Sequence, residues 1–199
     1  MRPDEGPILS RPQVISNLLI SARNSLRRSG RCRRSGLAVF HRLTEDDIYT
    51  RFFRRVRSLS YRELQTLCNV NHETDVAFLG VVGPRENEEI IGSACYFLNP
   101  TTNLAEVAFM VAPEFQGAGL GTALQAYLQE YAMSRGVRGF VFEIISRNIS
   151  MLRLAARAQG TMRTSRDDDV VQVTVLFPDS ARKPPAEPAY DDRAPAQIP

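Results

Sequence analysis

A glycine-rich segment, Gln116-Gly117-Ala118-Gly119-Leu120-Gly121, is the part of this sequence whose residue types most clearly indicate chemistry. Glycine lets the backbone turn tightly, and it leaves backbone N–H groups open to a ligand because it has no Cβ. A helical pattern follows, and the first N–H groups of a helix lack internal partners and favour an anion. We therefore expect this turn to bind a phosphate or a diphosphate; a purely structural turn is the alternative.

The spacing of the glycines narrows the identity of that anion. The pattern is G-x-G-x-G, with glycines at 117, 119 and 121. The dinucleotide fingerprint is G-x-G-x-x-G, and a P-loop requires a lysine directly after its last glycine. Neither pattern matches, so the segment favours a diphosphate ligand other than those held by the common nucleotide motifs.

Hydrophobic patterns place the turn between a strand and a helix. Apolar, β-rich stretches predict strands at 76–82, 90–98 and 104–111. The short connections between them contain turn residues and suit antiparallel hairpins. After the third strand the apolar period becomes 3.6, which predicts a helix that starts at Leu120 and that Gly136 closes.

The same reading extends to the C-terminal side of this unit. It predicts a strand at 137–145, a helix at 151–158 and a last strand at 170–177, with a turn at 167–169 before it. A helix intervenes between the strands at 104–111 and 137–145, so we expect these two to be parallel.

On the N-terminal side the sequence predicts one strand and two helix starts. Leu37-Ala38-Val39-Phe40 is a short apolar run that fits a strand. Thr44 precedes Asp47 by three residues, and Ser60 precedes Glu63 by the same spacing. This spacing is typical of a capping box.

The 199 residues thus divide into one domain at 37–178 and two appendages. Residues 1–36 include an arginine- and serine-rich stretch, and we expect a disordered leader; a basic arm for nucleic acid or a membrane surface is the alternative. That stretch lacks aromatic residues for base stacking, so we do not expect nucleic-acid binding. Residues 179–199 are proline-rich and predict a disordered tail. No apolar run approaches the roughly 20 residues that span a bilayer, so we expect no membrane association.

Cysteine and histidine give no sign of a metal site. Cys32, Cys68 and Cys95 form no C-x-x-C pair, and the two histidines are far apart. We expect no metal, and reduced thiols in a cytoplasmic protein. Cys95 lies on a predicted strand and could accept an acyl group, although buried cysteines are usually inert core residues.

The turn also carries a family resemblance. Gln116-x-x-Gly119-x-Gly121 resembles the Q/R-x-x-G-x-G/A signature of the GNAT superfamily of acetyltransferases, and the similarity covers roughly Leu37 to Phe177. It implies an α/β (α+β) domain: a mixed, mostly antiparallel sheet whose two central parallel strands splay apart and are flanked by helices. In that family the turn binds the pyrophosphate of acetyl-CoA, which is the expected cosubstrate.

The resemblance implies acetyl-CoA-binding residues on three segments: the strand end before the turn, the turn itself and the start of the last helix. Backbone N–H groups of the strand end would bind the pantetheine amides and polarise the thioester carbonyl. The asparagine after the parallel strand would help to hold the pantetheine arm. The matching residues are Met110, Val111, Ala112, Gln116, Gly117, Ala118, Gly119, Leu120, Gly121, Thr122 and Asn148.

A narrower resemblance concerns the acceptor. The segments 43–53 and 71–78 resemble the bacterial Pat-type protein lysine acetyltransferases. In that branch a glutamate on the strand before the turn is the general base, and Glu106 matches it. An ammonium must lose a proton before it can attack, and a nearby carboxylate can accept that proton; a structural glutamate facing solvent is the alternative. The tyrosine that many members place seven residues after the asparagine is absent, because Ala155 stands there.

Several other residues are weaker candidates. Glu143 on the parallel strand could act as a second carboxylate. Tyr49, Arg51 and Arg54 on the first helix could select the acceptor, or could form a solvated helix face.

The sequence therefore predicts an N-acetyltransferase whose acceptor is a protein lysine, and the resemblance implies an acyl-CoA synthetase-like partner. A small-amine acetyltransferase and a non-catalytic acyl-CoA sensor are the alternatives. The sequence does not fix the oligomeric state.

Overall fold

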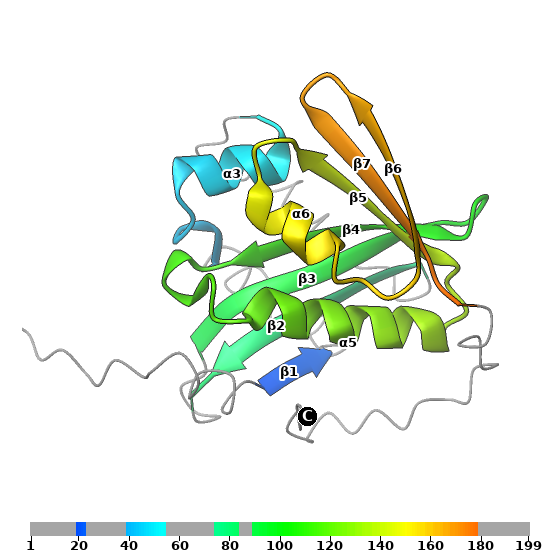
Figure 1. Ribbon diagram of the computed structural model, residues 1–199. Helices are drawn as coiled ribbons and strands as arrows, with labels where there is room; N and C mark the ends of the chain where they lie inside the picture. Colours follow the sequence, from blue (N-terminus) through cyan, green and yellow to red (C-terminus); the bar gives the residue numbers. More distant parts are fainter. Residues whose placement is uncertain (1–18, 23–38, 55–73, 84–88, 179–199) are drawn as a thin grey trace, which may run out of the picture.

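The computed structural model describes residues 19–22, 39–54, 74–83 and 89–178. Within these residues one sheet has the strand order β1-β2-β3-β4-β5-β7-β6 (Figure 1). The strands are β1 (Leu19–Ala22), β2 (Asp75–Val82), β3 (Glu89–Asn99), β4 (Leu104–Val111), β5 (Gly139–Ile145), β6 (Thr161–Asp167) and β7 (Val170–Leu176). The helices are α3 (Glu45–Phe52), α5 (Leu120–Ser134) and α6 (Ile149–Ala155), with a short 3-10 helix η3 (Pro113–Phe115).

The sheet is antiparallel except at its centre, where β4 and β5 run parallel. That parallel pairing is short, because it joins only 104–106 of β4 to 139–141 of β5. Beyond Glu106 the two strands separate, and Figure 1 shows β5, β7 and β6 inclined away from β4. The predicted fold class, a mixed and mostly antiparallel sheet with a splayed parallel pair, is confirmed.

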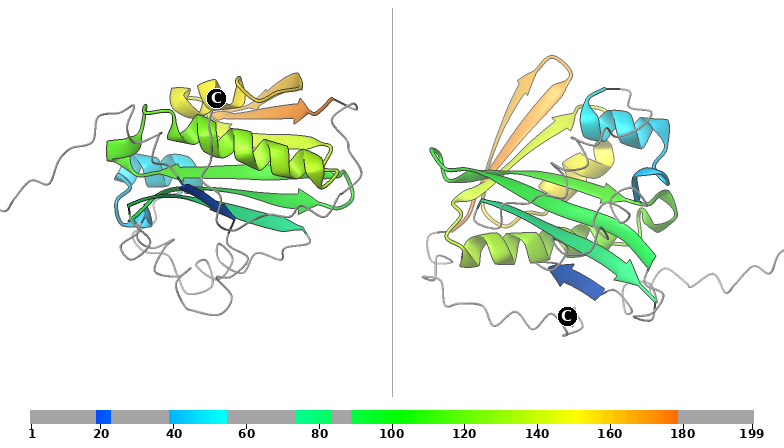
Figure 2. Two further views of the ribbon diagram at one scale, coloured as in Figure 1. Left: turned by 90° about the horizontal axis from the view of Figure 1, so that it is seen from below. Right: turned by 180° about the vertical axis from the view of Figure 1, so that it is seen from behind.

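Helix α5 covers one face of the sheet (Figure 2). Leu124 and Leu128 are fully buried there, and Tyr131 packs edge-to-face on Phe78 of β2 at 5.5 Å between ring centroids. Burying each such leucine contributes roughly 1.5–3 kcal/mol. The buried Gln129 side chain donates to the Gln159 carbonyl at 2.6 Å and accepts from its N–H at 3.1 Å, which fixes α5 to the segment after α6. The helix that follows the glycine turn is therefore firmly held.

Helix α3 begins as the sequence predicts. Thr44 is its N-cap and accepts a hydrogen bond from the Asp47 N–H at 3.1 Å, while the Asp47 carboxylate accepts one from the Thr44 N–H at 2.9 Å. The helix lies on the face of the sheet opposite α5. Its Arg51 reaches Cys95, whose side chain points away from the α5-facing Ala94 on the neighbouring position of β3.

The structure departs from the sequence analysis, or adds to it, at three places. Val39 and Phe40 are helical rather than extended; both are buried, and a short apolar run does not distinguish a strand from a buried helical turn. Strand β6 was not predicted, because it is an edge strand whose seven residues are all exposed and mostly polar. Strand β1 lies within the expected leader and pairs antiparallel with β2.

Other predictions lie outside the described residues. They concern the rest of the leader, the helix start at Ser60, the tail after 178, and two of the three cysteines. In the part of the chain that the structure describes, no helix is both long enough and apolar enough to cross a membrane.

Candidate functional site

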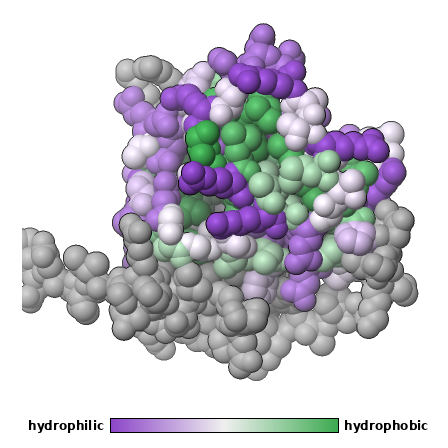
Figure 3. Space-filling view, viewed as in Figure 1, coloured by the Kyte–Doolittle hydropathy of each residue, from purple (hydrophilic) through white to green (hydrophobic). Residues whose placement is uncertain are grey.

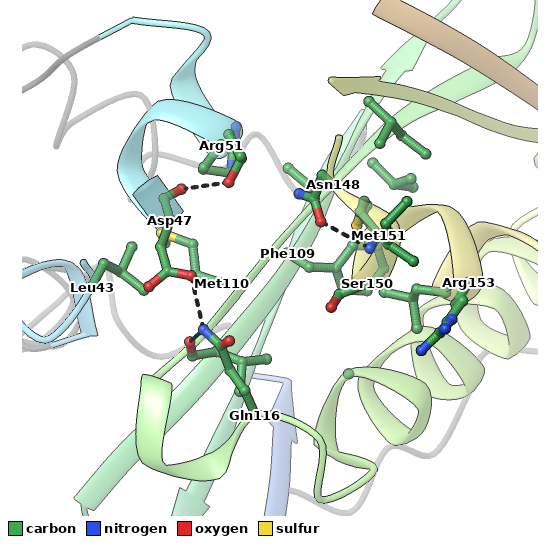
Figure 4. Close-up of a pocket in the computed structure, with 18 of the residues that line it drawn as sticks. Leu43, Asp47, Arg51, Phe109, Met110, Gln116, Asn148, Ser150, Met151 and Arg153 are labelled. Carbon is green, nitrogen blue, oxygen red and sulfur yellow. Dashed lines mark hydrogen bonds between the residues drawn. The ribbon is translucent and has the colours of Figure 1, made fainter. Parts of the chain in front are cut away.

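A cavity opens where β4 and β5 separate. It has a volume of about 710 Å³ and is lined by α3, the second half of β4, the glycine turn, β5 and α6. Figure 4 shows α3 and α6 on opposite sides of this cavity, with Gln116 of the turn near its base. On the face that carries α6, hydrophobic surface is gathered at the centre and hydrophilic residues surround it (Figure 3). Ile149, at the start of α6, is 52% exposed and lines the cavity.

The glycine turn has the geometry that an anion site requires. Gly117 and Gly119 have φ values of 70° and 91°, in the region that favours glycine, and a Cβ on Gly117 would meet no atom within 4 Å. Gly119 is the N-cap of α5 and makes no side-chain cap hydrogen bond. The first helical bond runs from the Ala123 N–H to the Gly119 carbonyl at 3.0 Å. The preceding N–H groups, of Leu120, Gly121 and Thr122, are therefore the unpartnered start of a helix, and these residues fit a diphosphate.

The direction of the N–H groups along β4 corrects the prediction of which residues donate to the ligand. The Ala112 N–H donates to the Ile91 carbonyl of β3 at 2.9 Å, so it is not free to bind a ligand. In an antiparallel strand the direction of N–H groups alternates, so the Met110 N–H also faces β3. The N–H groups of Val111 and Phe109 face the opposite side, toward the gap left by β5. Of the three strand-end residues predicted, only Val111 can offer its N–H to the gap, and Phe109 was missed.

The structure brings most of the predicted binding residues to this one cavity. Those that line it are Glu106, Met110, Val111, Gln116, Gly117, Gly119, Gly121, Thr122 and Asn148. Three do not line it. Ala112 and Leu120 have buried side chains, with exposed fractions of 0% and 1%, and Ala118 is absent from the lining. Leu120 still contributes its backbone N–H at the start of α5, whereas Ala112 contributes neither its side chain nor its N–H.

Asn148 is held as the N-cap of α6. Its side-chain oxygen accepts a hydrogen bond from the Met151 N–H at 3.0 Å, shown as a dashed line in Figure 4. This bond orients the side chain, so the amide NH₂ group is left as the donor on the cavity side.

Glu106 occupies the last paired position of β4 before the strands separate. It pairs with Val141 in the register, its side chain is exposed, and it lines the cavity. Glu143 lies two residues beyond Val141, so the two glutamates share one face of the sheet; it too is exposed and lines the cavity. Two carboxylates therefore face the region that α3 borders.

Cys95 lies on the same face as Glu106, since it pairs with Ala108 of β4. Burial raises the pKa of its thiol, and the nearby Glu106 and Asp75 carboxylates add to this, against the opposing effect of Arg51. A raised pKa keeps the thiol protonated, and the thiol is a weaker nucleophile than the thiolate. This environment disfavours Cys95 as an acyl acceptor.

Basic residues on the α6 side of the cavity were missed by sequence reasoning. Arg147, Arg153 and Arg157 all line it, and Arg157 donates to the Thr122 hydroxyl at 2.9 Å. The spacing of Arg153 and Arg157, four residues apart on a predicted helix, was a signal that they share a face. Their positive charge lies beside the N-terminus of α5 and reinforces the site's preference for an anion. Among the described residues, no group of side chains could hold a metal ion.

Comparison with known proteins agrees with this geometry. The model of the Acetyltransferase (GNAT) family matches residues 43–161. The chain belongs to this family. The matched region begins just before α3 and ends at the first residue of β6, so it contains every element that lines the cavity.

Three solved structures show the same fold. The GNAT domain of PAT from S. lividans is 22% identical, with a TM-score of 0.65 and coverage of 80% of this chain and 89% of that one. The yncA acetyltransferase from Salmonella typhimurium, solved with acetyl-CoA, is 14% identical, with a TM-score of 0.60 and coverage of 81% and 93%. Spermidine N-acetyltransferase from Vibrio cholerae, solved with CoA and spermine, is 17% identical, with a TM-score of 0.57 and coverage of 81% and 96%.

Proposed function

We propose that this protein is an acetyl-CoA-dependent N-acetyltransferase that modifies lysine side chains of proteins, with Glu106 as the general base. The observation that carries the proposal is the position of Glu106 at the point where β4 and β5 separate. Its exposed carboxylate faces the cavity that also contains the glycine turn. One site thus offers an anion cradle for the cosubstrate and a proton acceptor for the incoming amine.

Different residues along the cavity bind different parts of acetyl-CoA. Acetyl-CoA supplies the activated acetyl group as a thioester. The N-terminal N–H groups of α5 bind its diphosphate, with Arg153 and Arg157 nearby. The Val111 and Phe109 N–H groups face the gap and donate to the pantetheine arm and to the thioester carbonyl, where they stabilise developing negative charge.

Glu106 then accepts the proton of the acceptor amine, directly or through one water, as the amine attacks the carbonyl carbon. Coenzyme A leaves as a thiolate. Ala155, at the position where many relatives carry a tyrosine acid, is fully buried and does not line the cavity. We therefore propose that departure needs no acid from this position.

Two features support a lysine side chain as the acceptor. The segment 43–53, which resembles the Pat-type enzymes, consists of α3 and the residues next to it. It forms the wall of the cavity beside the two glutamates. The exposed carboxylates of Glu106 and Glu143 on the same face favour a cationic acceptor over an anionic one. We also propose a cytoplasmic location, in which thiols such as Cys95 stay reduced, and an acyl-CoA synthetase-like protein as the first partner to test.

The decisive test is the Glu106→Gln variant. We expect its turnover to fall by about 10²–10⁴-fold, the usual contribution of a general base, while acetyl-CoA binding measured by calorimetry is retained. Glu143→Gln is the matched control, because it removes an exposed carboxylate from the same face and should keep most of the rate. An unimpaired Glu106→Gln enzyme would contradict the assignment.

The acceptor needs a separate experiment. The protein is incubated with labelled acetyl-CoA and either an acyl-CoA synthetase, a cell lysate or a panel of small amines such as spermidine. Label on protein lysines supports the proposal, and turnover of small amines alone would replace it with the small-molecule alternative. Tight acetyl-CoA binding without any turnover would favour a sensor.

A further inference from the structure

We propose that Asp47 is a positioning residue that couples the acceptor-side helix α3 to the acetyl-CoA site through Gln116. The Gln116 side-chain amide donates to Asp47 Oδ1 at 3.0 Å and to the Val111 carbonyl at 3.2 Å. Asp47 lies on α3, Gln116 begins the glycine turn, and Val111 ends β4. A single side chain therefore touches the three elements that must act together, and Figure 4 shows the bond between Asp47 and Gln116 bridging α3 and the turn.

The two oxygens of the Asp47 carboxylate serve different elements. Oδ2 accepts from the Thr44 N–H at 2.9 Å and from the Thr44 hydroxyl at 2.6 Å, which completes the capping box of α3. Oδ1 accepts only from Gln116 among the described residues. The carboxylate is thus fixed by its own helix and presents its other oxygen to the turn, so α3 and the turn cannot shift independently without losing a charge-assisted hydrogen bond.

Gln116 lies beside the part of β4 that no longer pairs with β5. The Val111 carbonyl points to the side of β4 where β5 no longer pairs, as its N–H does. Gln116 satisfies this carbonyl and so helps to hold the end of β4, where the Val111 N–H faces the gap. Asp47 holds Gln116 in that place without itself touching the reacting atoms.

The other arm of the splayed sheet is also linked to the first half of α3. Arg147, after β5, pairs with Asp46 at 2.8 Å and lies over the Tyr49 ring at 5.2 Å. The Arg147 and Asp46 side chains are 57% and 67% exposed, so solvent screens this ion pair. Helix α3 therefore contacts both arms of the cavity, the turn through Asp47 and the end of β5 through Asp46 and Tyr49.

A coupling of this kind has a measurable consequence. Binding at the turn should order α3 even though α3 is the acceptor-side wall, and the coupling must act equally in both directions. We expect acetyl-CoA to slow amide hydrogen exchange in α3 as well as in α5 of the wild-type protein. In Asp47→Ala the protection of α5 should remain and that of α3 should be lost, while the acetyl-CoA dissociation constant rises severalfold.

Thr44→Ala is the matched control, because it removes a partner of the same cap but leaves the Asp47–Gln116 bond in place. It should loosen α3 in the absence of acetyl-CoA and yet retain the ligand-induced protection. Gln116→Ala should likewise abolish the ligand-induced protection of α3, and the double variant should lose no more of that protection than either single variant, as expected if it depends on the one bond between them.

Two results would overturn the proposal: equal loss of α3 protection in Thr44→Ala and Asp47→Ala, or unchanged protection in Asp47→Ala. Additive effects in the double variant would also contradict it. The proposal rests on acetyl-CoA binding at the turn, but its measurements involve neither an acceptor nor Glu106. Its failure is therefore distinguishable from failure of the proposed catalytic function.

Discussion

The parallel pair of β4 and β5 has a closed end, where the strands are hydrogen-bonded, and an open end, where they separate. Glycine serves opposite purposes at the two ends. At the closed end Gly139 starts β5, and the Arg138 N–H donates to the Asn103 carbonyl at 2.9 Å. A Cβ on Gly139 would overlap the Val175 carbonyl, so glycine there allows two backbones to approach. At the open end a Cβ on Gly117 would meet no protein atom within 4 Å. Glycine there leaves space for a ligand.

Substitution at the closed end should have the largest effect on stability. In Gly139→Ala the new methyl group meets backbone atoms of β7, which cannot move aside as a flexible side chain could. Because this overlap must open the β5–β7 pairing, we expect a loss of about 3 kcal/mol or more in the free energy of unfolding, at the upper end for overpacking. Denaturant unfolding followed by circular dichroism measures it. A near-neutral result would show that the closed end is looser than the structure indicates.

The second prediction concerns α6, the helix beside the open end. Ala155→Tyr restores the residue type that many relatives use as an acid, but Ala155 is fully buried in the core against which α6 packs. We expect overpacking to cost about 1–3 kcal/mol of stability without any rise in turnover. Leu154→Tyr is the control, since Leu154 lines the cavity and should accept a phenol with a smaller loss. A faster Ala155→Tyr enzyme would show that α6 can rotate this position into the site.

The two ends also differ in how far the sequence predicted them. The closed end follows from hairpin spacing and from a helix between two strands, and both signals are local. At the open end the sequence predicted the glycine turn, but it gave Met110, Val111 and Ala112 alike as donors, because a strand's period of two does not say which set of N–H groups faces its neighbour. Only the Ala112 bond to Ile91 fixes that phase.

Contacts between distant polar residues left no trace in the sequence pattern. Asp47 and Gln116 are 69 positions apart, Gln116 is exposed and Asp47 is half-buried, so neither periodicity nor burial links them. Strand β6 was missed for a related reason, because all of its residues are exposed. Apolar periodicity predicts which residues are buried, but it does not predict contacts between polar groups at a surface.

At the open end a methyl group should meet no protein atom, but it should lower the affinity for the ligand. In Gly117→Ala the Cβ enters the anion cradle, and we expect the acetyl-CoA dissociation constant to rise about tenfold, or ~1.4 kcal/mol. Gly136→Ala is the matched control: its φ of 74° resembles the 70° of Gly117, and a Cβ there also meets no atom within 4 Å. Both variants should lose similar stability from the left-handed backbone. Calorimetry should detect weaker binding in Gly117→Ala alone, and equal affinity in the two would argue against the cradle.

The smallest effect should appear at alkaline pH, on β3 opposite the open half of β4. Burial raises the pKa of the Cys95 thiol and of the Tyr96 hydroxyl above their ordinary values. Between its ordinary pKa and the raised one, each group stays protonated in the folded protein but loses its proton on unfolding. Stability is therefore unaffected below the unfolded thiol pKa of about 8.5 and falls as pH rises above it, with Tyr96 adding above about 10.

Cys95→Ala isolates the thiol's share of this decline. Urea unfolding of the wild type and the variant at pH of about 7.5 and 9.5 brackets the thiol's ordinary pKa but not that of tyrosine. The wild type should lose more stability between the two pH values than the variant, because only the wild type holds a protonated thiol at position 95 in the fold. An equal loss in both proteins would mean that solvent reaches the half-buried Cys95 thiol freely, and that burial does not raise its pKa.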